Sequence, residues 1–462
     1  MSDNHWPAFE PYKCKVIEKI SLTTPSQRRA AAERAKYNLF KLLAREVTID
    51  LLTDSGTAAM SDKQWSRVMV GDESYAGAES FVRFQETVRR ITGMQHVLPT
   101  HQGRAAENLL FSALLEPGAV VPNNTHFDTT EANVMHKGGK AVNLPCGSAA
   151  DIESDEPFKG DMDLARLDQV LEENAGRVPL VVMTVTNNSA GGQPVSMANI
   201  KATADICKKY QVPLYLDAAR YAENCWFIKH REKGYGKKSI EEIAHEMFGY
   251  ADGALMSAKK DAYVNMGGFL ATRDHEVKNK VAELMVVVEG FITYGGMSGR
   301  DMEAVAQGLL EGLDEEILTA RIAQVARLGE RLDKLGVPYL KPAGGHGIYL
   351  DARRMCPHIP QGQFPGQAIT VELYLEGGVR ACEIGSVMFA HPHPETGEMI
   401  YPELDLVRMA IPRRVYSESH MEHVAETCGR VMKRAEAIRG MKFTYEPPRL
   451  KHFLAHFDWV QG

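Results

Sequence analysis

Three short apolar runs, separated by two helical patterns, constrain the fold of this chain more than any other feature. The runs cover residues 180–185, 212–216 and 254–256, and each stops at polar residues. One helical pattern opens at Ser196, with apolar residues three to four positions apart, and the other opens at Ser239 with the capping box Ser-x-x-Glu. The order strand, helix, strand, helix, strand predicts an α/β protein built on a right-handed parallel sheet.

Polar residues that follow these runs are expected to meet at one edge of the sheet. Asn188, Asp217, Arg220 and Lys260 each come shortly after a predicted strand, and parallel sheets bind ligands beyond the carboxyl ends of their strands. Pyridoxal 5′-phosphate needs a lysine that bonds to its carbonyl carbon and a carboxylate beside its ring nitrogen. Lys260 and Asp217 fit these roles, so the sequence predicts a pyridoxal phosphate enzyme. The alternatives are a local ion pair between Asp217 and Arg220 and a solvated surface turn at Lys260.

A glycine-containing turn upstream is a candidate phosphate site. The segment Thr100–Arg104 precedes a helical pattern over Ala105–Leu110. Gly103 in this segment allows a ligand to approach the backbone where the first N–H groups of the helix are unpaired. The turn therefore predicts a cradle for the cofactor phosphate, and the alternative is an ordinary glycine between a strand and a helix.

Composition excludes several classes of function. A net charge of −7 and a pI near 6.2 argue against a nucleic-acid partner. The amino terminus lacks the pattern of a signal peptide, and the apolar runs are too short to span a membrane. Seven cysteines without a C-x-x-C pair indicate reduced thiols in a cytoplasmic protein. The pairs His391 with His393 and His420 with His423 lack further ligands at zinc spacing, so no zinc site is expected.

The length of 462 residues fits one large domain and one smaller domain. We expect a large cofactor-binding domain at residues 53–311 and a smaller α+β domain formed by residues 1–52 and 312–462. A long helical pattern over Asp301–Leu335 is expected to bridge the two.

Several longer motifs resemble those of the β-eliminating lyases. They are Leu51–Thr57, Gly71–Gly77, Pro99–Arg104, Ser189–Ser196 and Met256–Asp261. The resemblance extends over nearly the whole chain. It implies the pyridoxal phosphate fold type I, which is aspartate aminotransferase-like, with a large domain of mostly parallel sheet and a smaller α+β domain.

The resemblance also implies roles for individual residues. Lys260 would be the Schiff-base lysine, Arg408 would bind the substrate carboxylate, and Tyr75 would reach the active site from a neighbouring subunit. The residues implied at the cofactor are Gln102, Gly103, Arg104, Phe127, Asn188, Asp217, Arg220, Ser257 and Lys259. Those implied at the substrate are Thr53, Ser55, Ile384 and Arg408. Those implied around a monovalent cation, potassium, are Gly56, Glu73 and Asn265. A homotetramer acting on a small amino-acid substrate is implied as well.

Three positions, Asp128, Ile384 and His452, bear on which aromatic group leaves the substrate. Family members that release phenol resemble one another in having threonine, arginine and phenylalanine there, whereas this chain matches members that release indole from tryptophan. Ile384 offers no partner to a phenolic oxygen, and burial of that oxygen without a partner is costly. Asp128 can accept from the indole N–H or stabilise a protonated indole. The catalytic candidates are thus Lys260, Tyr75, Asp128 and His452.

Alternatives remain at these positions. Asp128 alone is also consistent with a helix cap, and His452 alone with a structural histidine on a strand near the carboxyl terminus. The chain lacks an insertion that is common in indole-releasing members after the helix at Leu110, and it resembles the phenol-releasing members there. A non-catalytic binding protein on the same scaffold is the alternative from another class. The residues that count against it are Lys260, Asp217, Arg220 and Arg408.

Overall fold

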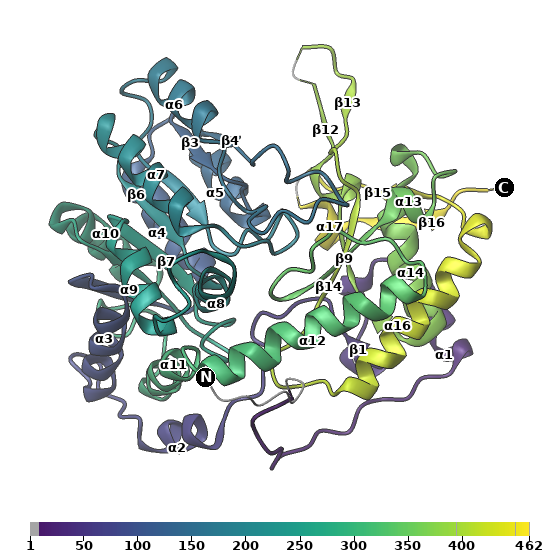
Figure 1. Ribbon diagram of the computed structural model, residues 1–462, viewed down its shortest axis with the longest axis horizontal. Helices are drawn as coiled ribbons and strands as arrows, with labels where there is room; N and C mark the ends of the chain where they lie inside the picture. The colour runs from purple at the N-terminus through teal and green to yellow at the C-terminus, as the bar shows by residue number, and fades with distance from the viewer. Residues whose placement is uncertain (1–8, 394, 449, 462) are drawn as a thin grey trace. The chain divides into compact units, whose positions relative to one another are not determined.

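A computed structural model describes residues 9–393, 395–448 and 450–461 (Figure 1). The chain divides into two compact units, which are described separately. The described part of the large unit comprises Ser55–Ala149 and Glu156–Ile322, and the small unit comprises Phe9–Asp54, Ala150–Asp155 and Ala323–Gly462. The last change of unit along the chain falls inside helix α12, Glu315–Lys334. The domain boundaries expected from the sequence stay a prediction.

The large unit contains, among the described residues, a seven-stranded sheet in the order β2-β8-β7-β6-β5-β3-β4. Its strands are β2 (His96–Thr100), β3 (Val120–Asn123), β4 (Lys140–Asn143), β5 (Val181–Thr184), β6 (Leu214–Asp217), β7 (Gly253–Ser257) and β8 (Gly268–Thr272). Strand β8 runs antiparallel to both its neighbours, and the pairs formed by β3, β4, β5, β6 and β7 are parallel. The predicted α/β class with a mostly parallel sheet is confirmed.

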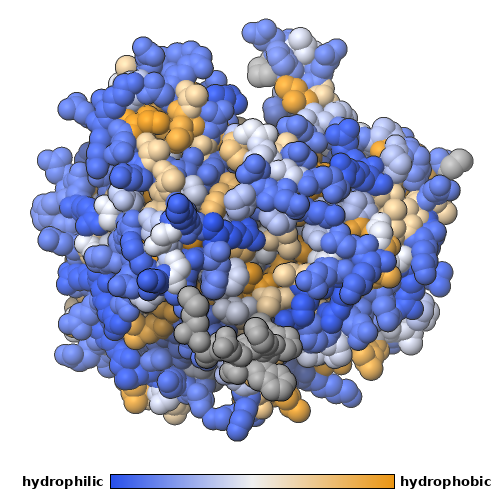
Figure 2. Space-filling view, in the orientation of Figure 1, coloured by the Kyte–Doolittle hydropathy of each residue, from blue (hydrophilic) through white to orange (hydrophobic). Residues whose placement is uncertain are grey.

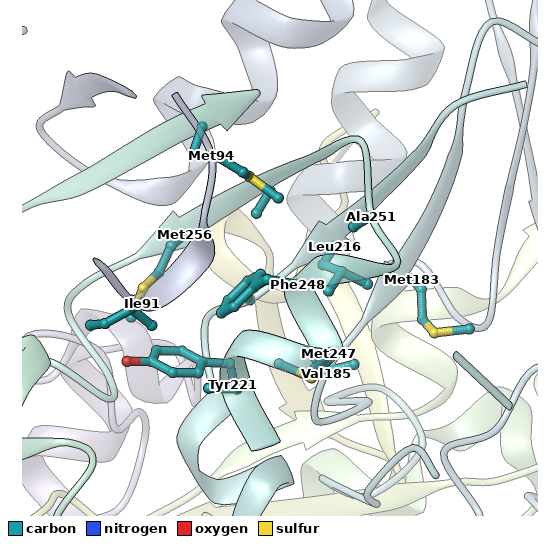
Figure 3. Packing of buried hydrophobic residues seen from close by; sticks show 14 of the residues in the cluster. Ile91, Met94, Met183, Val185, Leu216, Tyr221, Met247, Phe248, Ala251 and Met256 are labelled. Atoms are coloured by element: carbon teal, nitrogen blue, oxygen red, sulfur yellow. The ribbon is translucent and has the colours of Figure 1, made fainter. Parts of the chain in front are cut away.

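Helices cover both faces of this sheet. They are α2 (Asp62–Val70), α3 (Glu79–Thr92), α4 (Gly103–Leu114), α5 (Asp128–His136), α6 (Leu164–Glu173), α7 (Met197–Lys209), α8 (Tyr221–Arg231), α9 (Ile240–Gly249), α10 (His275–Val288) and α11 (Gly299–Glu311). Leu216 and Met256 enter one apolar core, where Figure 3 shows them beside Phe248 of α9. Tyr215 and Leu255 enter the other core with residues of α4 and α10. Neighbouring strand residues thus pack on opposite faces, as strand geometry requires.

The single long helix expected over Asp301–Leu335 is wrong, because α11 and α12 are separate helices. Asp314 is the last residue between the two helices. Its Oδ1 accepts a hydrogen bond from the backbone N–H of Glu316 at 2.9 Å and so caps the start of α12. Gly312 lies in the gap, and a Cβ there would approach the carbonyl oxygen of Asp261 to 2.5 Å. The apolar spacing continues across the gap, so periodicity alone does not reveal the break.

The small unit is built on an antiparallel sheet in the order β11-β14-β9. Its strands and helices include β1 (Ile49–Asp50), β9 (Gly347–Asp351), β10 (Val379–Arg380), β11 (Cys382–Ile384), β12 (His391–Pro392), β13 (Met399–Ile400), β14 (Leu406–Ala410), β15 (Met441–Tyr445), β16 (His456–Trp459), α1 (Pro25–Arg34), α13 (Ala352–Met355), α14 (Pro365–Gly377), α15 (Ser386–Phe389), α16 (Glu418–Lys433) and α17 (Lys451–Leu454). Strand β1, near the amino terminus, pairs in parallel with β10. The amino-terminal segment therefore completes this unit.

Hydrophilic side chains cover most of the face of the molecule in view in Figure 2. Of the helices in the described residues, none combines the length and the apolar character that crossing a membrane requires.

Candidate active site

The carboxyl ends of β5, β6 and β7 bring several predicted site residues together within the large unit. Asp217 is the last residue of β6 and pairs in register with Thr184 of β5 and Leu255 of β7. Beyond the strand ends, the backbone N–H of Arg220 donates to the carbonyl oxygen of Val185 at 3.2 Å. These bonds fix Asp217 and Arg220 at the strand ends. The charges of Lys260 and Arg220 both act on Asp217, so these three of the predicted residues lie together at this edge.

Lys260 lies in the turn that follows β7, and its Nζ donates a hydrogen bond to the Oγ of Ser257 at 2.8 Å. Its charge also acts on Asp217. Burial is the largest influence and raises the pKa of the Asp217 carboxyl, while the positive charges of Lys260 and Arg220 and the N–H of Ala219 oppose it. A buried carboxylate of this kind gains from a positively charged partner. A protonated pyridine nitrogen supplies such a charge.

The amino terminus of α4 forms a cradle with the end of β7. A Cβ on Gly103 would lie 2.7 Å from the Cβ of Ser257 and 3.0 Å from its backbone nitrogen, so only glycine fits. A Cβ on Gly268 would lie 3.0 Å from the nitrogen of Gly103. Gln102 is the N-cap residue of α4 and gives the helix no side-chain cap. The start of α4 is therefore suited to an anion.

Cationic side chains accompany this cradle. The pKa of Lys259 is lowered, first by burial and then by the positive charge of Arg104. Two cations that repel one another in a half-buried site are stabilised by a bound anion. The phosphate position predicted from Gln102, Gly103, Arg104, Ser257 and Lys259 is consistent with this chemistry.

The residues expected around a monovalent cation are only partly together. The Nδ2 of Asn265 donates to the carbonyl oxygen of Gly56 at 3.0 Å, and the N–H of Gly56 donates to the carbonyl oxygen of Lys259 at 2.8 Å. Glu73 instead contacts Arg300, with 3.1 Å between Oε1 and Nε. Ser55 belongs to the large unit, next to Gly56 in the chain.

Phe127 and Asp128 stand at the start of α5, where Phe127 is the N-cap residue and Asp128 is the first helical residue. The Oδ1 of Asp128 accepts from the backbone N–H of Thr129 at 2.6 Å. Asp128 is therefore not the N-cap residue that the alternative expected, because Phe127 occupies that position.

Glu107 of α4 is a buried acid near this position that the sequence did not reveal. The Oγ1 of Thr130 donates to its Oε1 at 2.6 Å. Burial raises the pKa of Glu107 to about 7, with the charges of Asp217 and Asp128 acting in the same direction and hydrogen bonds from Thr130 and Thr129 opposing. A glutamate in an amphipathic helical pattern is expected on the solvent-exposed face, so the local sequence gives no sign that Glu107 is buried.

His101 and Glu289 form a second polar group that sequence reasoning missed. The Nδ1 of His101 lies 2.6 Å from the Oε2 of Glu289, and its Nε2 lies 2.9 Å from the Nε2 of Gln102. The two residues of the pair are 188 positions apart in the chain. Only the folded sheet brings Glu289, which follows α10, to the end of β2.

Tyr75 is 71% exposed and lies against two aromatic rings of the large unit. Its ring is stacked on Phe291 with 5.8 Å between centroids, and it meets Tyr294 edge to face at 5.3 Å. The N–H of Gly77 donates to the Oγ1 of Thr293 at 3.1 Å and fixes the same loop. An exposed tyrosine held in one orientation is available to another molecule.

The small unit holds the remaining substrate candidates, Thr53, Ile384, Arg408 and His452. Arg408 is buried in the central strand β14, and its Nη2 donates to the carbonyl oxygen of Leu52 at 3.2 Å. Ile384 belongs to an apolar cluster with Leu52 and others.

His452 lies in helix α17, so its expected position on a strand is wrong. The residue is buried, and its ring packs against Phe453 and, edge to face, against Phe40. The Nδ2 of Asn38 donates to the carbonyl oxygens of His452 and Ala455, which anchors this short helix. Four residues form a single turn, too short for periodicity to distinguish from a strand.

The fold defines the class of protein. The chain is similar to Bna3p of Saccharomyces cerevisiae, a putative kynurenine aminotransferase, with a TM-score of 0.63, 18% identity, and coverage of 91% of this chain and 100% of that one. It is also similar to YbdL of Escherichia coli, which has a methionine aminotransferase function, with a TM-score of 0.61, 15% identity, and coverage of 90% and 100%. At such identity the likeness establishes the fold alone. This is the aminotransferase-like fold type I.

Sequence comparison gives the family. The profile described as Beta-eliminating lyase matches residues 50–427. A probable beta-eliminating lyase of Trichomonas vaginalis is 50% identical, over 98% of this chain and 99% of that protein. A tryptophanase of Hyphomonas neptunium is 49% identical over 97% and 99%, and a tyrosine phenol-lyase of Symbiobacterium sp. is 47% identical over 98% and 99%. The chain belongs to the β-eliminating lyase family.

Membership in this family implies pyridoxal phosphate as the cofactor, and the large unit fits it. Lys260 supplies an amine next to Ser257, and Asp217 supplies a buried carboxylate at the adjacent strand end. Gly103 leaves the backbone open at an anion-binding helix end, accompanied by the charge of Lys259. An amine, a carboxylate and a phosphate cradle are the three groups that the cofactor requires.

Proposed function

We propose that the protein cleaves L-tryptophan to indole, pyruvate and ammonia. The observation that carries the proposal of a lyase reaction is the grouping of Lys260, Ser257 and Asp217 at one edge of the sheet. Indole is favoured over phenol by Ile384, whose side chain is in an apolar cluster with Leu52 and Leu406. An apolar wall accepts an indole ring and leaves a phenolic hydroxyl without a partner.

Lys260 is the residue to which we assign removal of the α-proton. The bound cofactor withdraws electrons from the substrate α-carbon. The Oγ of Ser257 accepts a hydrogen bond from the Nζ of Lys260 at the end of β7, which would hold this amine at the site where it takes the proton. Asp217 would face the pyridine nitrogen. Burial raises the pKa of Asp217, and the positive charges of Lys260 and Arg220 oppose this effect and favour its ionised form.

A second proton donor must act on the indole ring. Carbon is a poor leaving group until the ring carbon is protonated, so this step needs an acid or a charge stabiliser. Asp128 at the start of α5 and the exposed Tyr75 are the residues we assign to it, and His452 is assigned to the catalytic site as well.

Arg408 is assigned to the substrate carboxylate. A guanidinium presents two parallel N–H donors to a carboxylate, which fixes orientation as well as affinity. Its position in the middle of β14 gives it a rigid support. Thr53 and Ser55 are assigned to the substrate as well.

A monovalent cation and an oligomer complete the proposal. Gly56, Glu73 and Asn265 are assigned to potassium, and Tyr75 is assigned to the active site of a neighbouring subunit in a homotetramer. The exposure of Tyr75 supports the second assignment. No nucleic acid or membrane takes part. Sedimentation and activity in potassium and sodium buffers test this proposal, and full activity of a monomer in sodium would contradict it.

Tyrosine phenol-lyase is the second candidate activity. A relative of that name from Symbiobacterium sp. is 47% identical over 98% of this chain, close to the 49% of the Hyphomonas neptunium tryptophanase. Identity therefore does not separate the two substrates, and the choice depends on Asp128, Ile384 and His452.

The experiment that tests the role of Asp128 compares two substrates. Asp128→Ala should reduce elimination of tryptophan by roughly a hundredfold or more, as expected for loss of a positioned acid or charge stabiliser. S-ethyl-cysteine has a leaving group that needs no ring protonation, so its elimination should fall far less. Equal loss on both substrates would instead assign Asp128 to the general structure of the site.

A further inference from the structure

Glu289, His101 and Gln102 form a continuous chain of hydrogen bonds that ends at the start of α4. The Oε2 of Glu289 accepts from the Nδ1 of His101 at 2.6 Å and lies 3.3 Å from the backbone nitrogen of His101. The Nε2 of Gln102 lies 2.9 Å from the other ring nitrogen of His101. Gln102 immediately precedes Gly103, the glycine of the anion cradle.

These contacts select one form of the imidazole. A carboxylate only accepts hydrogen bonds, so the proton of His101 is on Nδ1. An amide nitrogen only donates, so the Nε2 of His101 is the acceptor for Gln102. With both contacts made, Nδ1 donates to Glu289 and Nε2 accepts from Gln102, so Glu289 favours this tautomer of the ring.

The same contacts fix the amide of Gln102. One of its two N–H groups is directed to His101, which leaves the second N–H as a donor with a defined orientation. If the proton of His101 moved to Nε2, two donors would face each other and the amide would rotate to present its oxygen to the ring. Both N–H groups would then leave their present directions.

The surroundings hold Glu289 in place. It follows α10, and its backbone N–H donates to the carbonyl oxygen of Met285 at 2.9 Å. A Cβ on Gly296 would lie 3.0 Å from the Oε2 of Glu289 and 3.5 Å from the Cβ of His101, so the backbone at Gly296 closes over the pair. The side chain of Glu289 is 9% exposed, against 35% for His101.

We propose that Glu289 and His101 are positioning residues that orient the Gln102 amide as a donor to the phosphate of the cofactor. The proposal rests on the proposed function, because it takes the cradle at Gly103 as the phosphate site. It adds two residues, neither of which needs to touch the cofactor. Their effect is on affinity for the phosphate group and not on the chemical step.

The test measures binding of pyridoxal 5′-phosphate to the apoenzyme by the appearance of its visible absorbance. Glu289→Ala should raise Kd about tenfold to a hundredfold, as expected for one lost hydrogen bond to a charged group. Glu289→Gln keeps an oxygen acceptor for Nδ1–H and should bind within about threefold of the wild type. Binding of pyridoxal, which lacks the phosphate, should be unchanged in both variants. At saturating cofactor, kcat of Glu289→Ala should return to the wild-type value.

A double-mutant cycle separates the positioning role from general damage. Gln102→Leu should weaken binding as much as Glu289→Ala does, and the double variant should be no worse than either alone. Additive losses, or a wild-type Kd for Glu289→Ala, would overturn the proposal. If Glu289→Ala does not fold, His101→Phe replaces it in the same cycle with the same expected values.

Two controls distinguish failure of this inference from failure of the proposed function. Glu283→Ala changes an exposed glutamate on α10, the helix that Glu289 follows, and should leave Kd unchanged. Arg104→Ala removes a charge of the cradle and should weaken binding whether or not the Glu289 pair acts. Loss in Arg104→Ala without loss in Glu289→Ala would overturn only this inference. Wild-type binding in both would overturn the phosphate assignment as well.

Discussion

The Nζ of Lys260 donates to the Oγ of Ser257 across 2.8 Å, within the turn that ends β7. Ser257 also lies against Gly103 at the start of α4, where a Cβ would come within 2.7 Å of it. The residue assigned to the chemistry and the cradle assigned to the phosphate are thus joined through one serine. A change on either side is expected to affect the cofactor.

Substitution of the lysine tests the assignment of the covalent attachment. Lys260→Ala should lose covalent attachment of the cofactor and essentially all pyruvate formation, because no other amine is assigned to that position. Lys259→Ala, the matched neighbour, should keep the attachment and release cofactor more readily. Borohydride reduction followed by peptide mapping identifies the modified lysine. Labelling of Lys259 in the wild type would show that the assignment is wrong.

Gly103→Ala tests the close approach of α4 to β7. The added Cβ meets the backbone nitrogen of Ser257 at 3.0 Å, so one of the two elements must move. We expect a loss of roughly 1–3 kcal/mol in stability and at least about tenfold weaker cofactor binding. Gly249→Ala is the control, because a Cβ there has no neighbour within 4 Å. Thermal melting and cofactor titration measure the two effects, and equal behaviour of both variants would refute the cradle.

Glu107 predicts a dependence of stability on pH. Its pKa is about 7 in the folded state against an ordinary value of 4.5, so the folded state holds the proton more tightly. The stabilisation is complete below about pH 4.5 and is lost as pH rises to about 7, at a cost on the order of 3 kcal/mol. Glu107→Gln cannot ionise and should lack this loss.

The measurement is denaturant unfolding of the apoenzyme at several pH values. The free energy of unfolding of Glu107→Gln minus that of the wild type should increase between about pH 4.5 and pH 7. Above pH 7 this difference should stay constant. Glu116→Gln, an exposed glutamate after the same helix, should show no such trend. A difference between Glu107→Gln and wild type that does not vary with pH would exclude a raised pKa.

The sequence alone was enough to predict where the parallel strands of the sheet end and to which family the chain belongs. Buried parallel strands are short apolar runs, and the polar residues after them must lie at one edge, which places Asp217 and Lys260 together without further information. The direction of β8 was not predictable, because its pairing with β2 and β7 depends on residues far apart in the chain.

Contacts between distant segments account for the features that were missed. Glu289 reaches His101 across 188 residues, and no local pattern marks either one. The local sequence suggests that Glu107 is a surface residue, but in the structure α5 covers it. The break between α11 and α12 lies where the backbone of Gly312 comes close to the carbonyl oxygen of Asp261, although the apolar spacing suggests one helix.

The central claim, cleavage of tryptophan, is tested most directly by the ratio of kcat/KM for pyruvate release from L-tryptophan and from L-tyrosine. Ile384 gives a phenolic hydroxyl no partner, and a site without one discriminates strongly between substrates that differ in a polar group. The account predicts that kcat/KM for tryptophan exceeds that for tyrosine by on the order of a hundredfold or more, with one indole formed per pyruvate. Equal or greater efficiency with tyrosine, with release of phenol, would contradict it.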